Sequence, residues 1–212
     1  MSQQAIDSLK DAVVNMKFND SPELAEKCKS SGLSAVDILN KALLPALDVV
    51  GKLFKDGDYF LPDVLMSVKA YEGAYKLIDD ELKAGSYKAR GKILMGTVEG
   101  DIHEIGKNIL LALCQGNGFE VEDLGINVSP ATFLEKAKEI EPDIIGMSAL
   151  LTTTMPVMQK VIELFAENGL RDEYKFIVGG SPVNQKFADH IGADGYGEDA
   201  QSGIELIKRI TE

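Results

Sequence analysis

Cysteine, histidine and tryptophan are scarce in this sequence: its 212 residues include two cysteines, two histidines and no tryptophan. Two thiols, Cys28 and Cys114, are too few for the disulfide framework of a small secreted protein, so we expect buried free thiols. The chain has no basic segment followed by a long apolar run, and no stretch approaches the roughly 18 uninterrupted apolar residues of a membrane span. These absences predict a cytoplasmic protein with no membrane partner.

Positive charge is also in short supply. The sequence has 34 acidic and 22 basic residues, a formal net charge of −12 and an isoelectric point near 4.7. Nucleic acids and anionic membranes require positive protein surfaces, so the composition argues against both as the main partner. With 45% hydrophobic and 26% charged residues, the chain is typical of a soluble protein with one or two domains and a core of normal size.

The first 84 residues carry a helical pattern, because apolar side chains recur every three or four positions, as in the segment from Ile6 to Val13. Turn-forming residues divide this part into four helices, which predicts a helical bundle over residues 1–84. The third helix, roughly Ser34 to Lys55, should bend at Pro45. The fourth should run from Pro62 to about Lys83.

The pattern changes near residue 92 to alternating strands and helices. Apolar runs predict strands at residues 92–97, 120–124, 144–148, 175–178 and around 193–195, and helical patterns lie between and after them at about 104–116, 130–140, 154–168, 184–190 and 199–210. This alternation predicts a Rossmann-like (flavodoxin-like), doubly wound, five-stranded parallel sheet over residues 92–212. Residues 85–91, with two glycines, form the expected linker and hinge.

Polar residues follow the first expected strand in the spacing D-x-H-x-x-G, at Asp101, His103 and Gly106. Ligands of open α/β sheets bind beyond the carboxyl ends of the strands, so this position favours a functional site. A carboxylate beside an imidazole fixes its tautomer and makes the other ring nitrogen a better metal ligand. The triplet alone is more often a helix-capping aspartate with an incidental surface histidine, so other residues must decide.

Two further features follow the third and fourth expected strands. Ser148 and Leu150 form S-x-L, with 41 residues between Gly106 and Ser148, and Gly179-Gly180 comes next, with 28 residues between Leu150 and Gly179. With them the chain resembles the cobalamin-binding domain of methionine synthase and its relatives, whose D-x-H-x-x-G, S-x-L and G-G elements come in the same order at matching spacing. The combination is far more specific than any one element.

The resemblance implies cobalamin or a related corrinoid, in methylcobalamin and cob(I)alamin forms, bound base-off and His-on. In this state an imidazole replaces the nucleotide base on cobalt, and the nucleotide tail enters the α/β domain. His103 is then the cobalt ligand, and Asp101 and Thr154 form a relay behind it. Methionine synthase has serine where Thr154 stands, a change that keeps the hydroxyl. The other implied cofactor-binding residues are Gly106, Ser148, Leu150, Thr152, Gly179 and Gly180; at the glycines, a side chain would block a close approach of the ligand to the backbone.

The helical half also resembles the cap that covers the upper face of the corrin in methionine synthase. Phe60 and Val64, together with Ser67, are expected on one face of the last cap helix, where they would shelter a methyl group. Packing inside the helical bundle is an equally good explanation of the same apolar pattern.

Because only a cap and a corrinoid module are recognised, the chain resembles the stand-alone corrinoid proteins of anaerobic methyltransferase systems. This resemblance implies a methyl carrier that is not catalytic alone. A substrate-specific methyltransferase would load it from methanol, a methylamine, a betaine or an aryl methyl ether. A second methyltransferase would deliver the methyl group to tetrahydrofolate or a thiol such as coenzyme M, and a reductive activating protein would be a third partner.

Other classes of protein share parts of this pattern. A cobalamin-dependent light sensor or transcriptional regulator has the same two domains, but it adds a DNA-binding domain and a tryptophan in the cap. A cobalamin mutase subunit keeps D-x-H-x-x-G without the helical cap. A flavodoxin-like or response-regulator module would leave the combined motif unexplained, so the methyl carrier remains the favoured interpretation.

Overall fold

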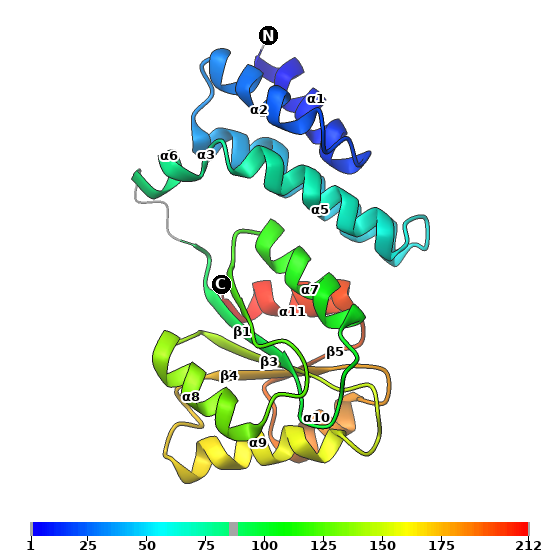
Figure 1. Cartoon of the computed structure of the whole chain (residues 1–212), viewed down its shortest axis with the longest axis vertical. Coiled ribbons are helices and arrows are strands. Elements are labelled where there is room, and N and C mark those ends of the chain that lie inside the picture. Colours follow the sequence, from blue (N-terminus) through cyan, green and yellow to red (C-terminus); the bar gives the residue numbers. More distant parts are fainter. Residues whose placement is uncertain (1, 85–88, 212) are drawn as a thin grey trace. The chain divides into compact units, whose positions relative to one another are not determined.

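The computed structural model describes residues 2–84 and 89–211, and the chain divides into two compact units (Figure 1). One unit is formed mainly by the residues before Arg90, the other mainly by the residues from Arg90 onward. Residues 85–88, which belong to the expected linker and hinge, lie outside the described residues.

The first unit is built from helices whose apolar faces pack together, with α1 against α2 and α4, and α5 against α2 and α4. Fully buried leucines, among them Leu9, Leu43 and Leu47, form its core. The elements are α1 (Ser2–Val14), α2 (Ser21–Ser30), α3 (Ala35–Ile38), the π-helical segment η1 (Leu39–Leu43), α4 (Leu44–Lys55), α5 (Leu61–Tyr75) and α6 (Asp79–Ala84).

The predicted third helix is interrupted ahead of its proline. It begins after Ser34, whose Oγ accepts a hydrogen bond from the Asp37 amide at 3.1 Å. The segment η1 then replaces the α-helical pattern, and the Leu44 amide donates to the Leu39 carbonyl five residues earlier. Pro45 has no amide hydrogen, and its ring crowds the carbonyl four residues before it, which explains the widened turn at this place.

The predicted fourth helix is shorter than expected, because α5 ends at Tyr75 and a separate helix, α6, begins at Asp79. Between them the amides of Leu77 and Ile78 donate to carbonyls three residues back, at 3.2 and 2.9 Å. Such bonds tighten the end of a helix. Ile78 and Leu82 are nevertheless buried, so the apolar pattern runs through the break and conceals it in the sequence.

The second unit contains the predicted five-stranded sheet. Strands and helices alternate along it as β1 (Lys92–Thr97), α7 (Ile105–Gly116), β2 (Glu120–Asp123), α8 (Pro130–Ile140), β3 (Ile144–Ser148), α9 (Met155–Glu167), β4 (Lys175–Gly179), α10 (Gln185–Ile191), β5 (Gly195–Gly197) and α11 (Ala200–Thr211). The strand order is β2-β1-β3-β4-β5, and every pair is parallel. The predicted doubly wound sheet is therefore confirmed.

The two faces of this sheet are covered differently. Helices α8, α9 and α10 lie on one face, and α7 and α11 on the other (Figure 1). Under α8–α10, strand residues such as Ile145 and Phe176 join Phe133 and Phe165 in a continuous buried core. Strand residues alternate between the faces, so Met95, Gly146 and Ile177, which are aligned across β1, β3 and β4, point toward α7 and α11.

The predicted buried free thiols are confirmed, since Cys28 and Cys114 are both buried and unpaired. Among residues 2–84 and 89–211, no helix combines the length and the apolar character needed to cross a bilayer.

Candidate functional site

The candidate site lies where the strand order changes direction. Strands β1 and β3 are neighbours in the sheet, with β2 on the outer side of β1, so the loops that leave β1 and β3 run toward opposite faces. Parallel α/β sheets bind ligands in the crevice that opens at such a point. The loop after β1 carries Asp101 and His103, and the loop after β3 carries Leu150 and Thr154.

Asp101 is a fully buried carboxylate that joins these two loops. Its Oδ1 accepts hydrogen bonds from the amide of His103 at 3.0 Å and lies 2.7 Å from the imidazole Nδ1 of the same residue. Its Oδ2 accepts hydrogen bonds from the Leu150 and Leu151 amides at 2.7 and 3.2 Å and from the Thr154 hydroxyl at 2.8 Å. Asp101 thus joins the His103 imidazole and the Thr154 hydroxyl in one hydrogen-bonded network.

The charge of Asp101 follows from this environment. Burial by itself raises the pKa of a carboxyl group, but the hydrogen bonds from His103, Leu150 and Thr154 outweigh burial and hold the pKa of Asp101 well below its ordinary range. Asp101 is therefore an anion at neutral pH. Because an ionised carboxylate only accepts hydrogen bonds, Nδ1 of a neutral His103 carries the ring proton, and Nε2 keeps its lone pair.

His103 presents one ring nitrogen for a ligand. Its side chain is 46% exposed, whereas Asp101 behind it is fully buried. Among the described residues no three histidine, cysteine or acidic side chains are grouped so that they could hold a metal ion. A metal bound at Nε2 would therefore have to bring most of its other ligands with it, as a metal in a macrocycle does.

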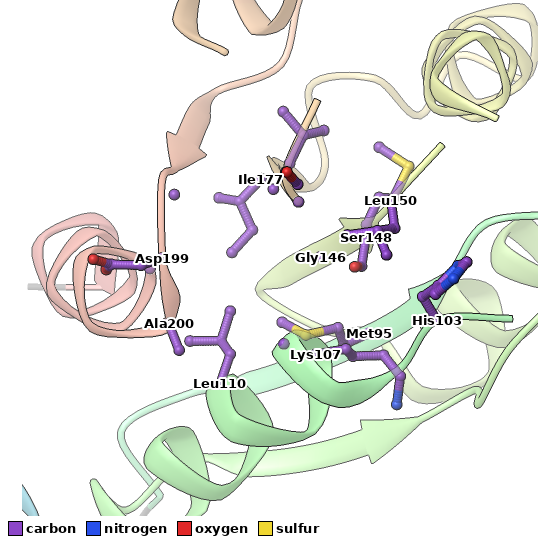
Figure 2. A pocket seen from close by; sticks show the side chains of 18 of the residues that line it. Met95, His103, Lys107, Leu110, Gly146, Ser148, Leu150, Ile177, Asp199 and Ala200 are labelled. Carbon is purple, nitrogen blue, oxygen red and sulfur yellow. The ribbon is translucent and has the colours of Figure 1, made fainter. Parts of the chain in front are cut away.

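A cavity of about 700 Å³ opens beside His103, between the sheet and the helices α7 and α11. In Figure 2 the side chains of Met95, Leu110 and Ile177 point into this cavity, with His103 and Leu150 at one end. The lining is mainly apolar, because Lys107 turns its amine to the side, where Nζ lies 2.7 Å from both carboxylate oxygens of Asp123. A flat, largely apolar group can fit such a slot.

Glycines keep the slot open. A Cβ atom at Gly106 would meet no atom within 4 Å, so a side chain there would enter the free space that the glycine lines. A Cβ atom at Gly146 would lie 2.6 Å from Cε of Met95, on the same side of the sheet. Any larger residue at Gly146 would therefore push Met95 or fill the cavity itself.

Most of the residues expected around the cofactor lie together here. Gly106, Ser148, Leu150, Gly179 and Gly180 all line the cavity. For the last two the structure adds another reason for glycine: a Cβ at Gly179 would lie 2.9 Å from the Gly197 carbonyl oxygen, and one at Gly180, whose φ is +118°, would collide with the Ala149 carbonyl oxygen.

The other expected cofactor contacts lie elsewhere. Thr152 is exposed and is not among the residues that line the cavity. Val64 and Ser67 are fully buried and Phe60 is 69% exposed, so the three do not form one exposed face. Ser67 Oγ donates to the Val14 carbonyl of α1 at 3.3 Å, which places its side chain inside the helical unit. Packing in the bundle, the alternative considered from the sequence, explains Val64 and Ser67.

Comparison with known proteins agrees with this geometry. Residues 91–205 and residues 5–78 each match a family described as a B12 binding domain. The chain belongs to the corrinoid protein family. A corrinoid protein of Desulfitobacterium hafniense is 43% identical over 99% of both chains. Dimethylamine corrinoid protein 3 of Methanosarcina acetivorans is 44% identical over 94% of this chain and 93% of its own.

Solved structures match nearly the whole length of this chain. A cobalamin-binding protein from Desulfitobacterium hafniense matches 97% of this chain and 98% of its own with a TM-score of 0.77 at 32% identity. The methanol:cobalamin methyltransferase complex MtaBC from Methanosarcina barkeri contains a chain that matches 98% of this corrinoid protein over 80% of its own length, with a TM-score of 0.87 at 31% identity.

The site of this corrinoid protein fits its cofactor in chemical terms. A single oriented imidazole suits a cobalt ion whose equatorial ligands belong to a macrocycle. Four apolar side chains near His103 are exposed to a degree unusual for their size, and such surfaces mark ligand or partner sites. They are Ile102, Ile105, Leu150 and Leu151.

The ion pair between Lys107 and Asp123 of this corrinoid protein was not predicted from the sequence. Lys107 follows Gly106 directly, and its side chain is completely buried against Asp123 at the end of β2. A lysine in the first turn of a helix is usually solvated, and its partner lies 16 positions away. The only signal is that Lys107 lies at the start of the helix that follows the first predicted strand, whereas Asp123 lies near the end of the second.

Proposed function

We propose that this corrinoid protein is a methyl carrier that binds its corrinoid base-off and His-on. A substrate-specific methyltransferase would load it from methanol, a methylamine, a betaine or an aryl methyl ether. A second methyltransferase would unload it onto tetrahydrofolate or a thiol such as coenzyme M, and a reductive activating protein would return it to the reduced form. When bound, the corrinoid supplies a cobalt centre that accepts and releases a methyl group.

The observation that carries this proposal is the position of His103. Its imidazole stands at one end of an apolar slot of about 700 Å³, and its Nδ1 faces a buried carboxylate at 2.7 Å. His103 would hold cobalt through Nε2, and the slot would receive the displaced nucleotide base. Ser148 and Leu150 line the same slot and would contact that base.

The relay gives the chain a way to take up a proton. Nε2 of His103 can bind either a metal or a proton, and Nδ1 can keep its contact with Asp101 in both cases. When Nε2 gains a proton, the imidazolium carries a positive charge beside the anionic Asp101. The Thr154 hydroxyl bonds to the other carboxylate oxygen, so it would respond to the same change of charge.

The relatives support a partner methyltransferase. The matching structure from Methanosarcina barkeri is a complex of a methanol:cobalamin methyltransferase, and the curated relatives include dimethylamine and trimethylamine corrinoid proteins. A carrier that meets its substrate through a separate enzyme needs no substrate pocket of its own. The donor is then chosen by the partner enzyme.

The ligand role of His103 can be tested with the two histidines of the chain. His103→Ala should keep some cobalamin through the nucleotide tail but lose the visible spectrum of imidazole-bound cobalt. His190→Ala is the matched control, because His190 is exposed on α10. An unchanged spectrum in His103→Ala would rule out His103 as the ligand.

The carrier role needs a functional readout. The reduced holoprotein should gain a methyl group, followed by absorbance, when it is mixed with one methyl donor and its cognate methyltransferase from a panel of such pairs. Light-dependent retention of DNA, with no methylation by any pair, would instead identify a light-sensing regulator.

A further inference from the structure

The loop that carries His103 is held from outside by the connection between β2 and α8. Asn127, in that connection, makes two hydrogen bonds to the His103 loop. Its side-chain Oδ1 accepts from the Gly100 amide at 2.7 Å, and its own amide donates to the Asp101 carbonyl at 2.9 Å. Asn127 thus holds the two peptide groups on either side of the backbone turn that precedes His103.

The backbone at both ends of this contact is unusual. Asn127 has φ = +54° and Gly100 has φ = +84°, which places both in the left-handed region. Asparagine tolerates that region better than most residues other than glycine. A glycine at position 127 would keep the backbone conformation and lose the side-chain acceptor, whereas most other residues would lose the acceptor and disfavour the conformation. Asparagine satisfies both requirements at once.

Asn127 is itself fixed to the sheet. The Thr97 amide at the end of β1 donates to the Gly125 carbonyl, and the Val128 amide donates to the Thr97 carbonyl, both at 2.9 Å. Residues on either side of Asn127 are therefore anchored to β1. The buried Thr97 also donates its hydroxyl to the His103 carbonyl at 3.0 Å, so the same strand end supports the loop from a second point.

We propose that Asn127 is a positioning residue for His103. It fixes Gly100 and the backbone of Asp101, so the Asp101 carboxylate reaches the His103 imidazole and the Leu150 amide together. The proposal rests on the proposed function in assigning cobalt to His103, whereas the order that Asn127 imposes on the loop exists without cofactor. It follows from this proposal that the β2–α8 connection determines how rigidly the His103 imidazole is held in position.

Three substitutions separate the side chain from the backbone. Asn127→Gly keeps the left-handed conformation and removes the acceptor. Asn127→Asp keeps an oxygen acceptor in the same place. Glu141→Gly is the control, because Glu141 also has a positive φ, +49°, but it follows α8 at the amino-terminal edge of the sheet, away from His103.

Two readouts use the corrinoid-free protein. In Asn127→Gly, exchange of the Gly100 amide hydrogen should become about fivefold faster, as expected from the loss of one hydrogen bond. The ¹⁵N spectrum of the His103 ring should change from one dominant Nδ1–H tautomer to a mixture. Asn127→Asp and Glu141→Gly should both behave like the parent protein in these measurements.

The third readout uses the cobalamin-loaded protein. Asn127→Gly should lower the imidazole-bound fraction of the visible spectrum about fivefold relative to the base-bound form, and Asn127→Asp should restore it. The proposal is overturned if Asn127→Gly matches the parent protein in ring tautomer and spectrum, or if Asn127→Asp behaves like Asn127→Gly. If the parent protein takes up no corrinoid, the proposed function fails, and the tautomer and exchange measurements still decide the role of Asn127.

Discussion

The two faces of the sheet are made by the same strands but have different roles. In β3, Ile145 and Met147 point into the core under α8–α10, whereas Gly146 and Ser148 line the cavity under α7 and α11. The period of two that defines a strand lets one segment supply large residues to one side and small ones to the other. One face stabilises the unit, and the other reserves space for a ligand.

The aromatic residues sharpen this contrast. Phe165 packs edge to face against Phe176 and Tyr174, with ring centroids 5.0 and 5.5 Å away. Among the described residues no such aromatic group lies on the opposite face, where the strands contribute Met95, Gly146 and Ile177 to the cavity lining. The aromatic packing that stabilises this unit is thus concentrated on the face under α8–α10. A cavity can therefore lie on the other face without weakening that core.

Removing an aromatic ring from the face under α8–α10 should have the largest effect on stability. Phe165→Ala should lower the free energy of unfolding by about 3–5 kcal/mol, because it leaves a large void in a packed core. Leu110→Ala, beside the cavity, should cost less than half as much, since its side chain is only partly buried. Urea unfolding of the corrinoid-free protein measures both, and equal losses would show that the two faces are packed alike.

Filling the cavity under α7 and α11 should impair corrinoid binding without impairing stability. Gly106→Val should weaken corrinoid binding by at least about 100-fold, equivalent to about 2.7 kcal/mol, and change the free energy of unfolding by less than about 0.5 kcal/mol. Ala131→Val is the matched control, because Ala131 is exposed at the second position of α8, as Gly106 is the second residue of α7. Equilibrium loading with cobalamin tests both variants, and normal loading of Gly106→Val would refute the placement of the tail.

The stability cost of a substitution should depend on pH at the site but not in the core under α8–α10. Asp101 has a lowered pKa in the folded protein, so its contribution is present above the unfolded pKa of about 3.9 and is lost as the pH falls further. Asp101→Asn should cost about 2 kcal/mol at pH 7, through weaker hydrogen bonds, and progressively less below about pH 4. The deficit of Phe165→Ala should not follow this trend.

Urea unfolding of both variants at pH 7, 5 and 3 makes this comparison. Asp189→Asn, on the exposed surface of α10, is the control for removal of a carboxylate. A deficit for Asp101→Asn that stayed constant between pH 7 and pH 3 would contradict the ionised state assigned to Asp101.

The sheet was predictable because its signals are local. The starts of β1, β3 and β4 at Lys92, Ile144 and Lys175 coincide with the predicted apolar runs. The short edge strand β5 lies at Gly195–Gly197, about two residues later than expected, because a three-residue strand leaves little periodicity to read. The D-x-H spacing was also local, so the pairing of Asp101 with His103 could be anticipated.

The contacts that support the site could not be read in the same way. Asn127 and Gly100 are 27 residues apart, and Asn127 gives only the signal of a turn. An apolar stripe on a helix does not reveal which surface it packs against, and so Val64, grouped with Phe60 from the sequence, is instead buried. These contacts depend on how segments that are distant in the sequence pack together, and the sequence of one segment does not determine that.

The two buried cysteines have a consequence for a protein proposed to carry methyl groups. Burial raises the pKa of both Cys28 and Cys114, so their sulfur atoms remain protonated and enclosed. Thiolates are strong nucleophiles, whereas buried thiols are inert. The chain therefore exposes no sulfur of these two residues that would become alkylated by its own cargo, and repeated turnover would not inactivate it by that route.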